Sequence, residues 1–82
     1  MFFVYTLLSH KDKKLYIGQA NNLEKRIKEH LAGKVPSTRH RRPLILLFSE
    51  QFPSRSEAVQ KEKYYKTQRG REKLKSLIQS KP

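Results

Sequence analysis

Four residues between positions 14 and 30 have side chains or spacing suited to phosphate chemistry: Tyr16, Gly18, Arg26 and His30. Arg26 and His30 are four residues apart on an expected helix, so their side chains share one helical face. The planar guanidinium of Arg26 can bond two phosphate oxygens. Simpler readings stay open: Arg26 lays its stem over the core, and His30 satisfies carbonyls of the last helical turn.

A tyrosine in the preceding segment extends this set. Residues 2–8 have strand composition, the polar stretch SHKDKK follows, and LYIG is a second short strand, which together indicate an antiparallel hairpin. With a loop over Ser9–Asp12, Tyr5 lies opposite Tyr16 on one face of the sheet, and a slip of one residue would separate them. The alternative is that both are ordinary strand aromatics and that Gly18 only ends a strand.

Glu62 is the acid that breaks a local pattern. The stretch SRSEAVQKEKYYKTQ predicts a helix with Ser54 as N-cap and Glu57 three residues later. Ala58 and Tyr65 fall on the same side of this helix as Glu62, the side that should meet the sheet. Carboxylates are rarely buried unless they are paired or bind a metal. A metal site and a structural ion pair with a nearby Lys or Arg are both compatible with this position.

The remaining elements follow from caps and apolar runs. Residues 21–33 predict a helix that begins at Asn21 as N-cap, ends at Gly33, and buries a stripe of Leu23, Ile27 and Leu31. Residues 34–43 form a charged loop, and the apolar run at 44–52 predicts the central strand. Gly70 separates the second helix from a last helix over 71–79.

The order strand, strand, helix, strand, helix, helix predicts a small α+β fold with a three-stranded antiparallel or mixed sheet flanked by helices, as a single domain over 1–82. The chain has no cysteine, which excludes a disulfide scaffold, a thiolate nucleophile and a cysteine zinc site. No run approaches the roughly 20 apolar residues that span a bilayer, and no signal peptide is recognised. We therefore expect a cytoplasmic protein that does not enter a membrane.

The net charge of +12, from 19 Lys and Arg against 7 Asp and Glu, favours a polyanionic partner. Nucleic acid is the simplest such partner, and an anionic membrane surface is the competing one. The cations gather in two basic segments, at 39–42 and 66–75, which we interpret as a phosphate-backbone footprint. The residues expected to contact nucleic acid are Arg39, Arg41, Arg42, Lys66, Arg69 and Arg71.

Together these residues resemble the GIY-YIG nuclease superfamily, in its small stand-alone form similar to the N-terminal domain of UvrC. The matching segments are FVYT at 3–6, LYIGQANNLEKRIKEH at 15–30, HRRP at 40–43 and SEAVQKEKYYKTQRGREKLK at 56–75. They cover nearly the whole chain in the family's order, and the succession is much more specific than any single element. One departure is the first motif, which reads Phe3-Val4-Tyr5 without its leading glycine.

The resemblance implies a metal-dependent endonuclease that hydrolyses DNA phosphodiester bonds around one divalent cation, Mg²⁺ or Mn²⁺. By position, Tyr5 and Tyr16 correspond to the two motif tyrosines, and Gly18 belongs to the second motif. Arg26 corresponds to the phosphate-binding arginine and Glu62 to the metal-holding glutamate. His30 resembles a histidine found here in several branches of the family. A tyrosine would orient or deprotonate the attacking water, and the choice of general base is open.

The substrate and the pathway follow less closely from the resemblance. It implies structure-selective cutting or low sequence specificity, in DNA repair or recombination, with RNA as the alternative substrate. A separate target-recognition domain does not fit in 82 residues, so a protein partner could supply that recognition. Two rival readings are a non-catalytic basic module that binds nucleic acid and a structural basic domain that docks onto an acidic partner.

Overall fold

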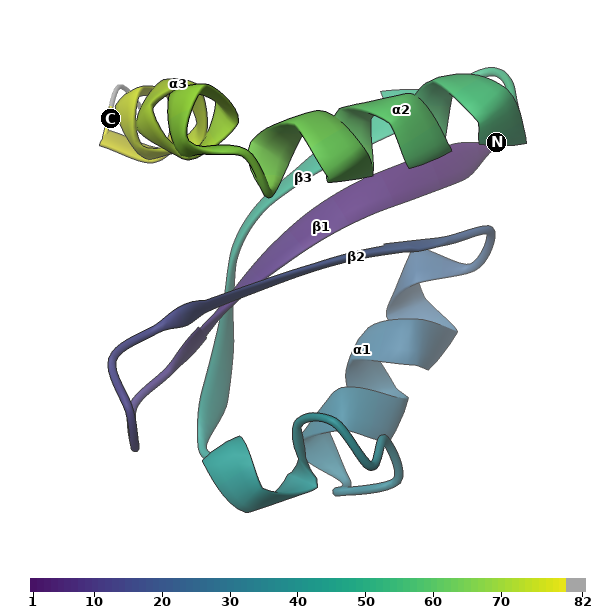
Figure 1. Cartoon of the computed structure of the whole chain (residues 1–82). Helices are drawn as coiled ribbons and strands as arrows, with labels where there is room; N and C mark the ends of the chain where they lie inside the picture. Colours follow the sequence, from purple (N-terminus) through teal and green to yellow (C-terminus); the bar gives the residue numbers. More distant parts are fainter. Residues whose placement is uncertain (80–82) are drawn as a thin grey trace.

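A computed structural model describes residues 1–79, which build one three-stranded sheet with helices on both of its faces (Figure 1). The elements in chain order are β1 (Phe2–Ser9), β2 (Leu15–Ala20), α1 (Leu23–Leu31), the short 3-10 helix η1 (Arg39–Arg41), β3 (Leu44–Phe52), α2 (Arg55–Tyr65) and α3 (Gln68–Gln79). The predicted α+β class and element order are confirmed. The end of the predicted domain, residues 80–82, lies outside the described residues.

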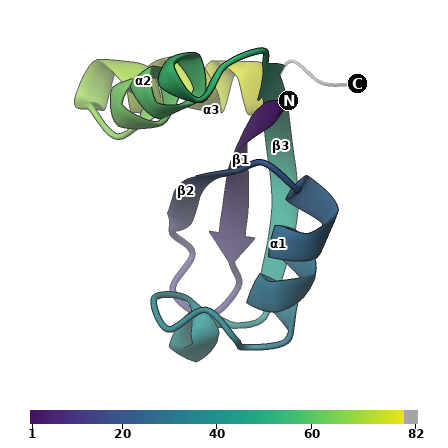
Figure 2. The ribbon, with the colours of Figure 1, turned by 90° about the vertical axis from the view of Figure 1, so that its right-hand side faces the viewer.

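The sheet is antiparallel throughout, in the order β2-β1-β3, so β1 is its central strand (Figure 2). The prediction that residues 44–52 form the central strand is wrong, because β3 lies at an edge and leaves Ile45 and Leu46 44% and 40% exposed. An apolar run indicates that other elements cover the strand, but it does not indicate which strands pair with it. The first strand is equally apolar, and it alone pairs on both sides.

The register of the hairpin differs from the predicted one by two residues. Tyr5 pairs with Gly18 and Leu7 with Tyr16, because the turn between the strands runs to Lys14. The turn contains Lys13 at φ 62°, in the left-handed region. A shift of two residues keeps every side chain on its face. The predicted pairing of the two tyrosines is therefore wrong, but their common face is confirmed by ring centroids 6.4 Å apart.

Helix α1 begins one residue later than predicted. Asn22, and not Asn21, is the N-cap, and its side-chain oxygen accepts a hydrogen bond from the backbone N–H of Lys25 at 3.1 Å. Gly33 follows the helix at φ +78°, as its position predicts. The predicted burial of Leu31 is wrong: it is 50% exposed.

His30 instead occupies the buried position of this helix and is 0% exposed. At 100° per residue, a residue seven positions after Leu23 lies closer to the buried stripe than one eight positions after it. A polar side chain therefore takes the place that an apolar pattern assigns to Leu31.

Alternation along β1 divides the interior into two cores. Val4 packs with Ala58, Tyr65 and Leu74 on the side covered by α2 and α3. Tyr5 packs with Leu7 and Leu44 on the other side, where Leu23 and Ile27 of α1 join them. Figure 1 shows α2 and α3 above the sheet and α1 below it. The sheet thus separates an apolar core from one that contains the candidate tyrosines.

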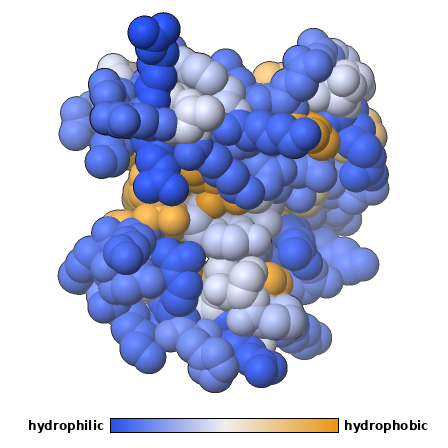
Figure 3. Space-filling view, viewed as in Figure 1, coloured by the Kyte–Doolittle hydropathy of each residue, from blue (hydrophilic) through white to orange (hydrophobic). Residues whose placement is uncertain are grey.

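The face of the molecule shown in Figure 3 is mostly hydrophilic, and its hydrophobic atoms lie mainly in a hollow beneath α3. No helix within residues 1–79 is long and apolar enough to cross a membrane.

Ser54 caps the start of α2, accepting a hydrogen bond from the N–H of Glu57 at 3.2 Å, as predicted.

The helices α2 and α3 meet at a tight corner. The prediction that Gly70 separates the two helices is wrong. The break falls at 66–67, where the Thr67 hydroxyl donates to the Tyr64 carbonyl and accepts from the Gly70 N–H. Gly70 lies inside α3, where an added Cβ would stand 1.7 Å from the Tyr64 carbonyl oxygen.

We expect Gly70→Ala to lower the free energy of unfolding by about 2 kcal/mol, because the added methyl overlaps the backbone of α2. In a helix without that contact the same change raises stability by up to about 1 kcal/mol. Urea unfolding of the wild type, Gly70→Ala and the exposed control Ser76→Ala measures the sign. A more stable Gly70→Ala variant would contradict the close approach of the two helices.

Candidate functional site

The hydroxyl of Tyr5 lies directly over the backbone of Gly18, its partner in the hairpin register. A Cβ added at Gly18 would lie 2.5 Å from the Tyr5 hydroxyl oxygen and 2.6 Å from the ring carbon that carries it. Any larger residue would therefore displace the phenol. The reading that Gly18 only ends a strand is wrong, because β2 continues to Ala20. Gly18 instead makes the space that the Tyr5 hydroxyl occupies.

A buried chain of hydrogen bonds starts at this hydroxyl. The Tyr5 oxygen lies 2.8 Å from Nε2 of His30, and Nδ1 of His30 lies 2.7 Å from the Thr38 hydroxyl. Tyr5 is 1% exposed, and His30 and Thr38 are 0% exposed. These bonds join β1, α1 and the loop before η1. The expectation that His30 satisfies carbonyls of its own helix is wrong, because both ring nitrogens bind other segments.

Tyr16 completes a cluster of three rings. Its ring centroid lies 5.2 Å from that of His30, edge to face, and the Tyr5 and His30 centroids are 5.4 Å apart. The Ser37 hydroxyl lies 3.5 Å from the Tyr16 hydroxyl, at the outer side of the cluster. Tyr16 is half-buried, unlike Tyr5 and His30. It is therefore the ring of this cluster that solvent or a ligand reaches most directly.

Arg26 stands beside the rings on α1, one turn before His30. Its side chain is 39% exposed, and its Nη1 donates to the Glu29 carboxylate at 3.2 Å. The neighbouring Tyr5 hydroxyl and then Glu29 raise the pKa of the guanidinium. Because a guanidinium only donates, we expect the Tyr5 hydroxyl beside Arg26 to donate its own proton to Nε2 of His30. Nδ1 of His30 would then donate to the Thr38 hydroxyl.

The ionisation of Tyr5 reports its surroundings. Burial raises the pKa of Tyr5, and the charges of Tyr16 and Glu62 raise it further, while the Arg26 guanidinium lowers it. The net shift is upward, so Tyr5 keeps its proton at neutral pH. The Glu62 carboxylate on α2 is the smallest of these influences on the pKa of Tyr5.

Glu62 lies on the buried side of α2, as predicted, with Ala58 and Tyr65 fully buried on the same side. Its side chain is 21% exposed and accepts a hydrogen bond from the Lys66 ammonium at 2.8 Å. Lys66 remains 52% exposed, and ion pairs between exposed side chains contribute only about 0–1 kcal/mol. The carboxylate is thus paired, as one reading of the sequence expects, without being locked to its partner.

A metal at Glu62 would have to be one that needs few protein ligands. Among residues 1–79 there is no group of three or more His, Cys, Asp or Glu side chains able to hold an ion. Mg²⁺ commonly takes one or two carboxylates and completes its shell with waters and substrate phosphates. A single half-buried glutamate fits that donor set, and it does not fit a metal that is held by protein ligands alone.

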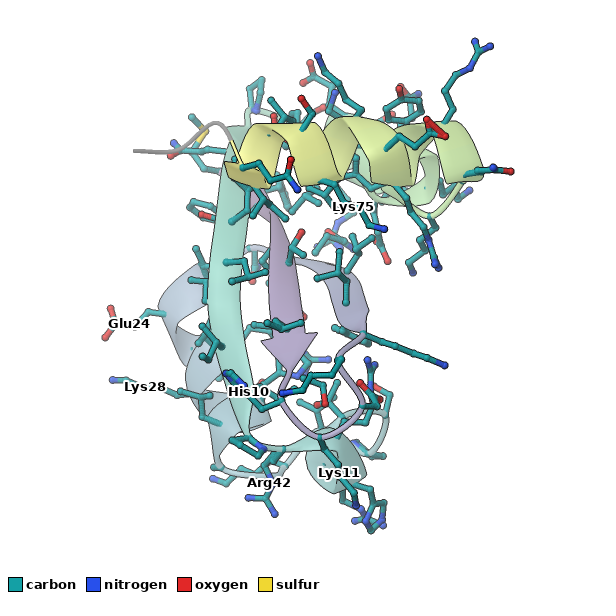
Figure 4. All side chains as sticks on the ribbon, turned by 90° about the vertical axis from the view of Figure 1, so that its left-hand side faces the viewer. His10, Lys11, Glu24, Lys28, Arg42 and Lys75 are labelled. Carbon is teal, nitrogen blue, oxygen red and sulfur yellow. The ribbon has the colours of Figure 1, made fainter. Side chains whose placement is uncertain are left out.

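The cations predicted to contact nucleic acid are divided among separate places. Arg39 and Arg42 line a hollow of about 560 Å³ at the η1 end, and Arg42 packs over Gly33. Figure 4 labels Arg42 at the opposite end of the sheet from Lys75. Arg41 binds Asp12 at 2.7 Å and holds the pKa of that carboxyl well below its usual range. The α2–α3 group consists of Lys66, Arg69 and Arg71, all exposed.

The structure therefore brings together Tyr5, Tyr16, Arg26 and His30, with Glu62 in electrostatic range of Tyr5 and Lys66 paired with Glu62. Sequence reasoning missed Thr38. Its position in a charged loop carries no periodic signal, and only the fold places its hydroxyl against the His30 ring.

Residues 1–75 of the chain match the GIY-YIG catalytic domain family. The chain belongs to this family, whose catalytic domains imply a nuclease-type function, a nucleic-acid substrate and, in general, a divalent metal.

Similar proteins carry the name UPF0213. The UPF0213 protein SH2523 of Staphylococcus haemolyticus is 42% identical over 76 residues, which cover 92% of each chain. The UPF0213 protein CPE1444 of Clostridium perfringens is 45% identical over 82 residues, or 99% of this chain and 86% of that one. The solution NMR structure of the UPF0213 protein BH0048 from Bacillus halodurans is 38% identical and covers 94% of this chain and 85% of its own, with a TM-score of 0.58.

The buried side chain of His30 should make the stability of the fold depend on pH. Burial lowers the pKa of His30 below its ordinary 6.5, and the charge of Arg26 lowers it further, while Glu29 raises it. Between pH 6.5 and that lower folded pKa, the unfolded chain holds a proton that the folded chain lacks. Stability from this group is therefore present above pH 6.5 and decreases as the pH falls through that window. Urea unfolding at pH 7, 6 and 5 should show a steeper loss for the wild type than for His30→Gln. Equal slopes would contradict a buried neutral histidine.

Proposed function

We propose that the chain is a metal-dependent endonuclease that hydrolyses phosphodiester bonds in DNA. The observation that carries the proposal is the cluster of Tyr5, Tyr16 and His30 rings beside Arg26, with Glu62 close enough to raise the pKa of Tyr5. Hydrolysis needs an activated water, a group that neutralises growing phosphoryl charge and an acid that holds a cation. The cluster offers a residue for each task, and family membership supports the same chemistry.

Arg26 binds the scissile phosphate in this proposal. Its contact with Glu29 at 3.2 Å is a partly exposed ion pair, which a doubly hydrogen-bonding phosphate can displace. As water attacks phosphorus, negative charge grows on the phosphoryl oxygens, and a guanidinium fixed beside them stabilises that charge. In this proposal the phosphate bound by Arg26 lies against Tyr16, because Arg26 is next to the ring cluster.

Tyr16 orients the attacking water, since it is the half-exposed ring while Tyr5 and His30 are buried. Tyr5 holds Tyr16 and Arg26 in place: its ring packs near Tyr16 and its oxygen faces Arg26. His30 and Thr38 fix the Tyr5 hydroxyl from behind. Because the pKa of Tyr5 is raised and that of His30 lowered, both stay neutral, so the buried chain serves to position the outer residues.

Glu62 is the proposed ligand for one Mg²⁺ or Mn²⁺ ion. When bound, the cation acts as a Lewis acid that makes a water easier to deprotonate and offsets phosphoryl charge. To bind the cation, the Glu62 carboxylate would give up its ion pair with Lys66. The half-exposed Lys66 ammonium would then be available to a phosphate.

The substrate, the pathway and the location stay proposals. We propose DNA, with RNA as the alternative, cut with structure selectivity or low sequence specificity in repair or recombination. A protein partner would supply recognition of a particular target. The single domain over 1–82 and the cytoplasmic location remain predictions from the sequence, as do the phosphate contacts of the outlying arginines.

A non-catalytic nucleic-acid-binding module is the second candidate, and one observation favours it. The two charged side chains central to the proposed reaction are both already paired, Arg26 with Glu29 and Glu62 with Lys66. A protein that kept the fold for binding alone would show steep salt dependence and no metal-dependent turnover.

We expect Glu62→Gln to lower the cleavage rate about 100-fold or more, because the loss of a cation worth several kcal/mol in the transition state has that effect. The assay incubates each protein with Mg²⁺ or Mn²⁺ and single-stranded, flapped and branched DNAs. Glu72→Gln, an exposed acid on α3, is the control with the same change of charge. If the wild type cuts no better than Glu62→Gln on every substrate, the enzyme proposal fails and the binding module stands.

Thr38→Val should lower kcat roughly tenfold while the KM for DNA stays near the wild-type value, because a buried Nδ1–H loses its acceptor and the support behind Tyr5 loosens. Thr38→Ser should restore kcat, and ¹⁵N NMR of His30 should show the proton on Nδ1 in the wild type and in Thr38→Ser. An unchanged kcat in a folded Thr38→Val protein would show that Thr38 does not position His30 and Tyr5 for cleavage.

A further inference from the structure

A second cationic hollow lies on the opposite face of β2 from Tyr16. It occupies about 630 Å³ between the β1–β2 turn and α3, and Figure 3 shows hydrophobic atoms at its floor. In Figure 4, Lys75 points from α3 toward the sheet on this side. We call it the α3 groove. Its cations are Lys13, Lys14, Arg41, Arg71 and Lys75.

The groove has a large excess of positive charge. Asp12 is the one acid among its lining residues, and it is bound by Arg41 at 2.7 Å, with its pKa held well below the usual range. Asp12 therefore stays ionised and cancels only Arg41. The four other cations remain in a confined space, where their mutual repulsion favours an anionic ligand with several charges.

The position of the groove connects it to the proposed active site. β2 is an edge strand of the sheet, and its side chains alternate: Tyr16 faces the α1 side, while Leu15 and Ile17 face the other. Arg71 lies in the first turn of α3, five residues after Lys66, the partner of Glu62. A chain that leaves the site around the edge of β2 would enter the α3 groove.

We propose that the α3 groove binds the phosphate backbone of a single-stranded segment of the nucleic acid, continuous with the scissile phosphate; this rests on the proposed function. The volume is that of a pocket for a small ligand, which suits one strand. Leu15 at the floor of the groove is partly exposed between the cations and can contact the sugar and base surfaces of a single strand, whereas a duplex keeps its bases stacked inside. The groove supplies affinity and direction, with no reading of sequence.

The test compares two triple variants with equal change of charge. Lys14→Gln/Arg71→Gln/Lys75→Gln removes three of the five cations of the α3 groove. The control, Lys25→Gln/Lys28→Gln/Lys34→Gln, removes three cations from the hollow along α1 and the residues that follow it. Binding of a labelled single-stranded oligonucleotide, a blunt duplex and phosphatidylserine vesicles is measured without metal over a range of salt, with folding checked by circular dichroism.

We expect the groove variant to bind the single strand roughly tenfold more weakly, with a salt slope shallower by about two, from about 0.7 per lost phosphate contact. The control should lose less than about threefold. Equal losses in both variants, a larger loss for duplex, or a loss confined to vesicles would overturn the proposal. Cleavage is not used as a readout, so a wild type that binds through the groove but never cuts would refute only the nuclease proposal.

Discussion

The hydroxyl of Tyr5, enclosed by Gly18 on one side and His30 on the other, is the constraint on which the rest of the site depends. A polar group that is 1% exposed must be hydrogen-bonded or it costs about 1–3 kcal/mol. His30 meets this need only if α1 packs with its last turn against β1, and Thr38 meets the need of the other ring nitrogen only if the following loop folds back. One buried chain thus sets the position of three segments, and with them the position of Arg26.

Local signals in the sequence predicted the elements, because caps and helical faces depend on residues a few positions apart. Ser54 and Gly33 behave as their types predict, and the buried side of α2 carries Glu62 as the 100° periodicity indicates. The choice of central strand failed because residues 2–8 and 44–52 are both apolar, and the pairing partners of a strand are set by contacts far along the chain.

Other errors have equally specific causes. The hairpin register depends on a turn that contains Lys13 in a left-handed conformation, which its residue type does not indicate. Gly70 is in α3 because another helix approaches it, a contact that a sequence pattern cannot express. No sequence signal indicated Thr38. Residue type and spacing singled out Tyr5, Tyr16, Arg26 and Glu62, and the resemblance to a family assigned their proposed roles, since each alone has an ordinary structural reading.

The charged residues near the site are held in weak pairs that a ligand can exchange. Arg26 with Glu29 and Glu62 with Lys66 are both partly exposed, so solvent screening limits their strength. These two ion pairs neutralise the charged side chains when no substrate is bound, and they leave the side chains free to move. The chain's excess of cations is placed elsewhere, including the α3 groove, where long-range attraction can bring a polyanion to the site.

The central claim is that the carboxylate of Glu62 and the ring cluster share one cation-dependent phosphate site. NMR of the protein with a short phosphodiester oligonucleotide, titrated with Mn²⁺, tests it most directly, because the paramagnetic ion broadens the resonances nearest to it. The account predicts selective broadening centred on Glu62 that extends to Tyr16 and Arg26 and disappears in Glu62→Gln. Broadening centred on the acids of α1, or unchanged in Glu62→Gln, would contradict it.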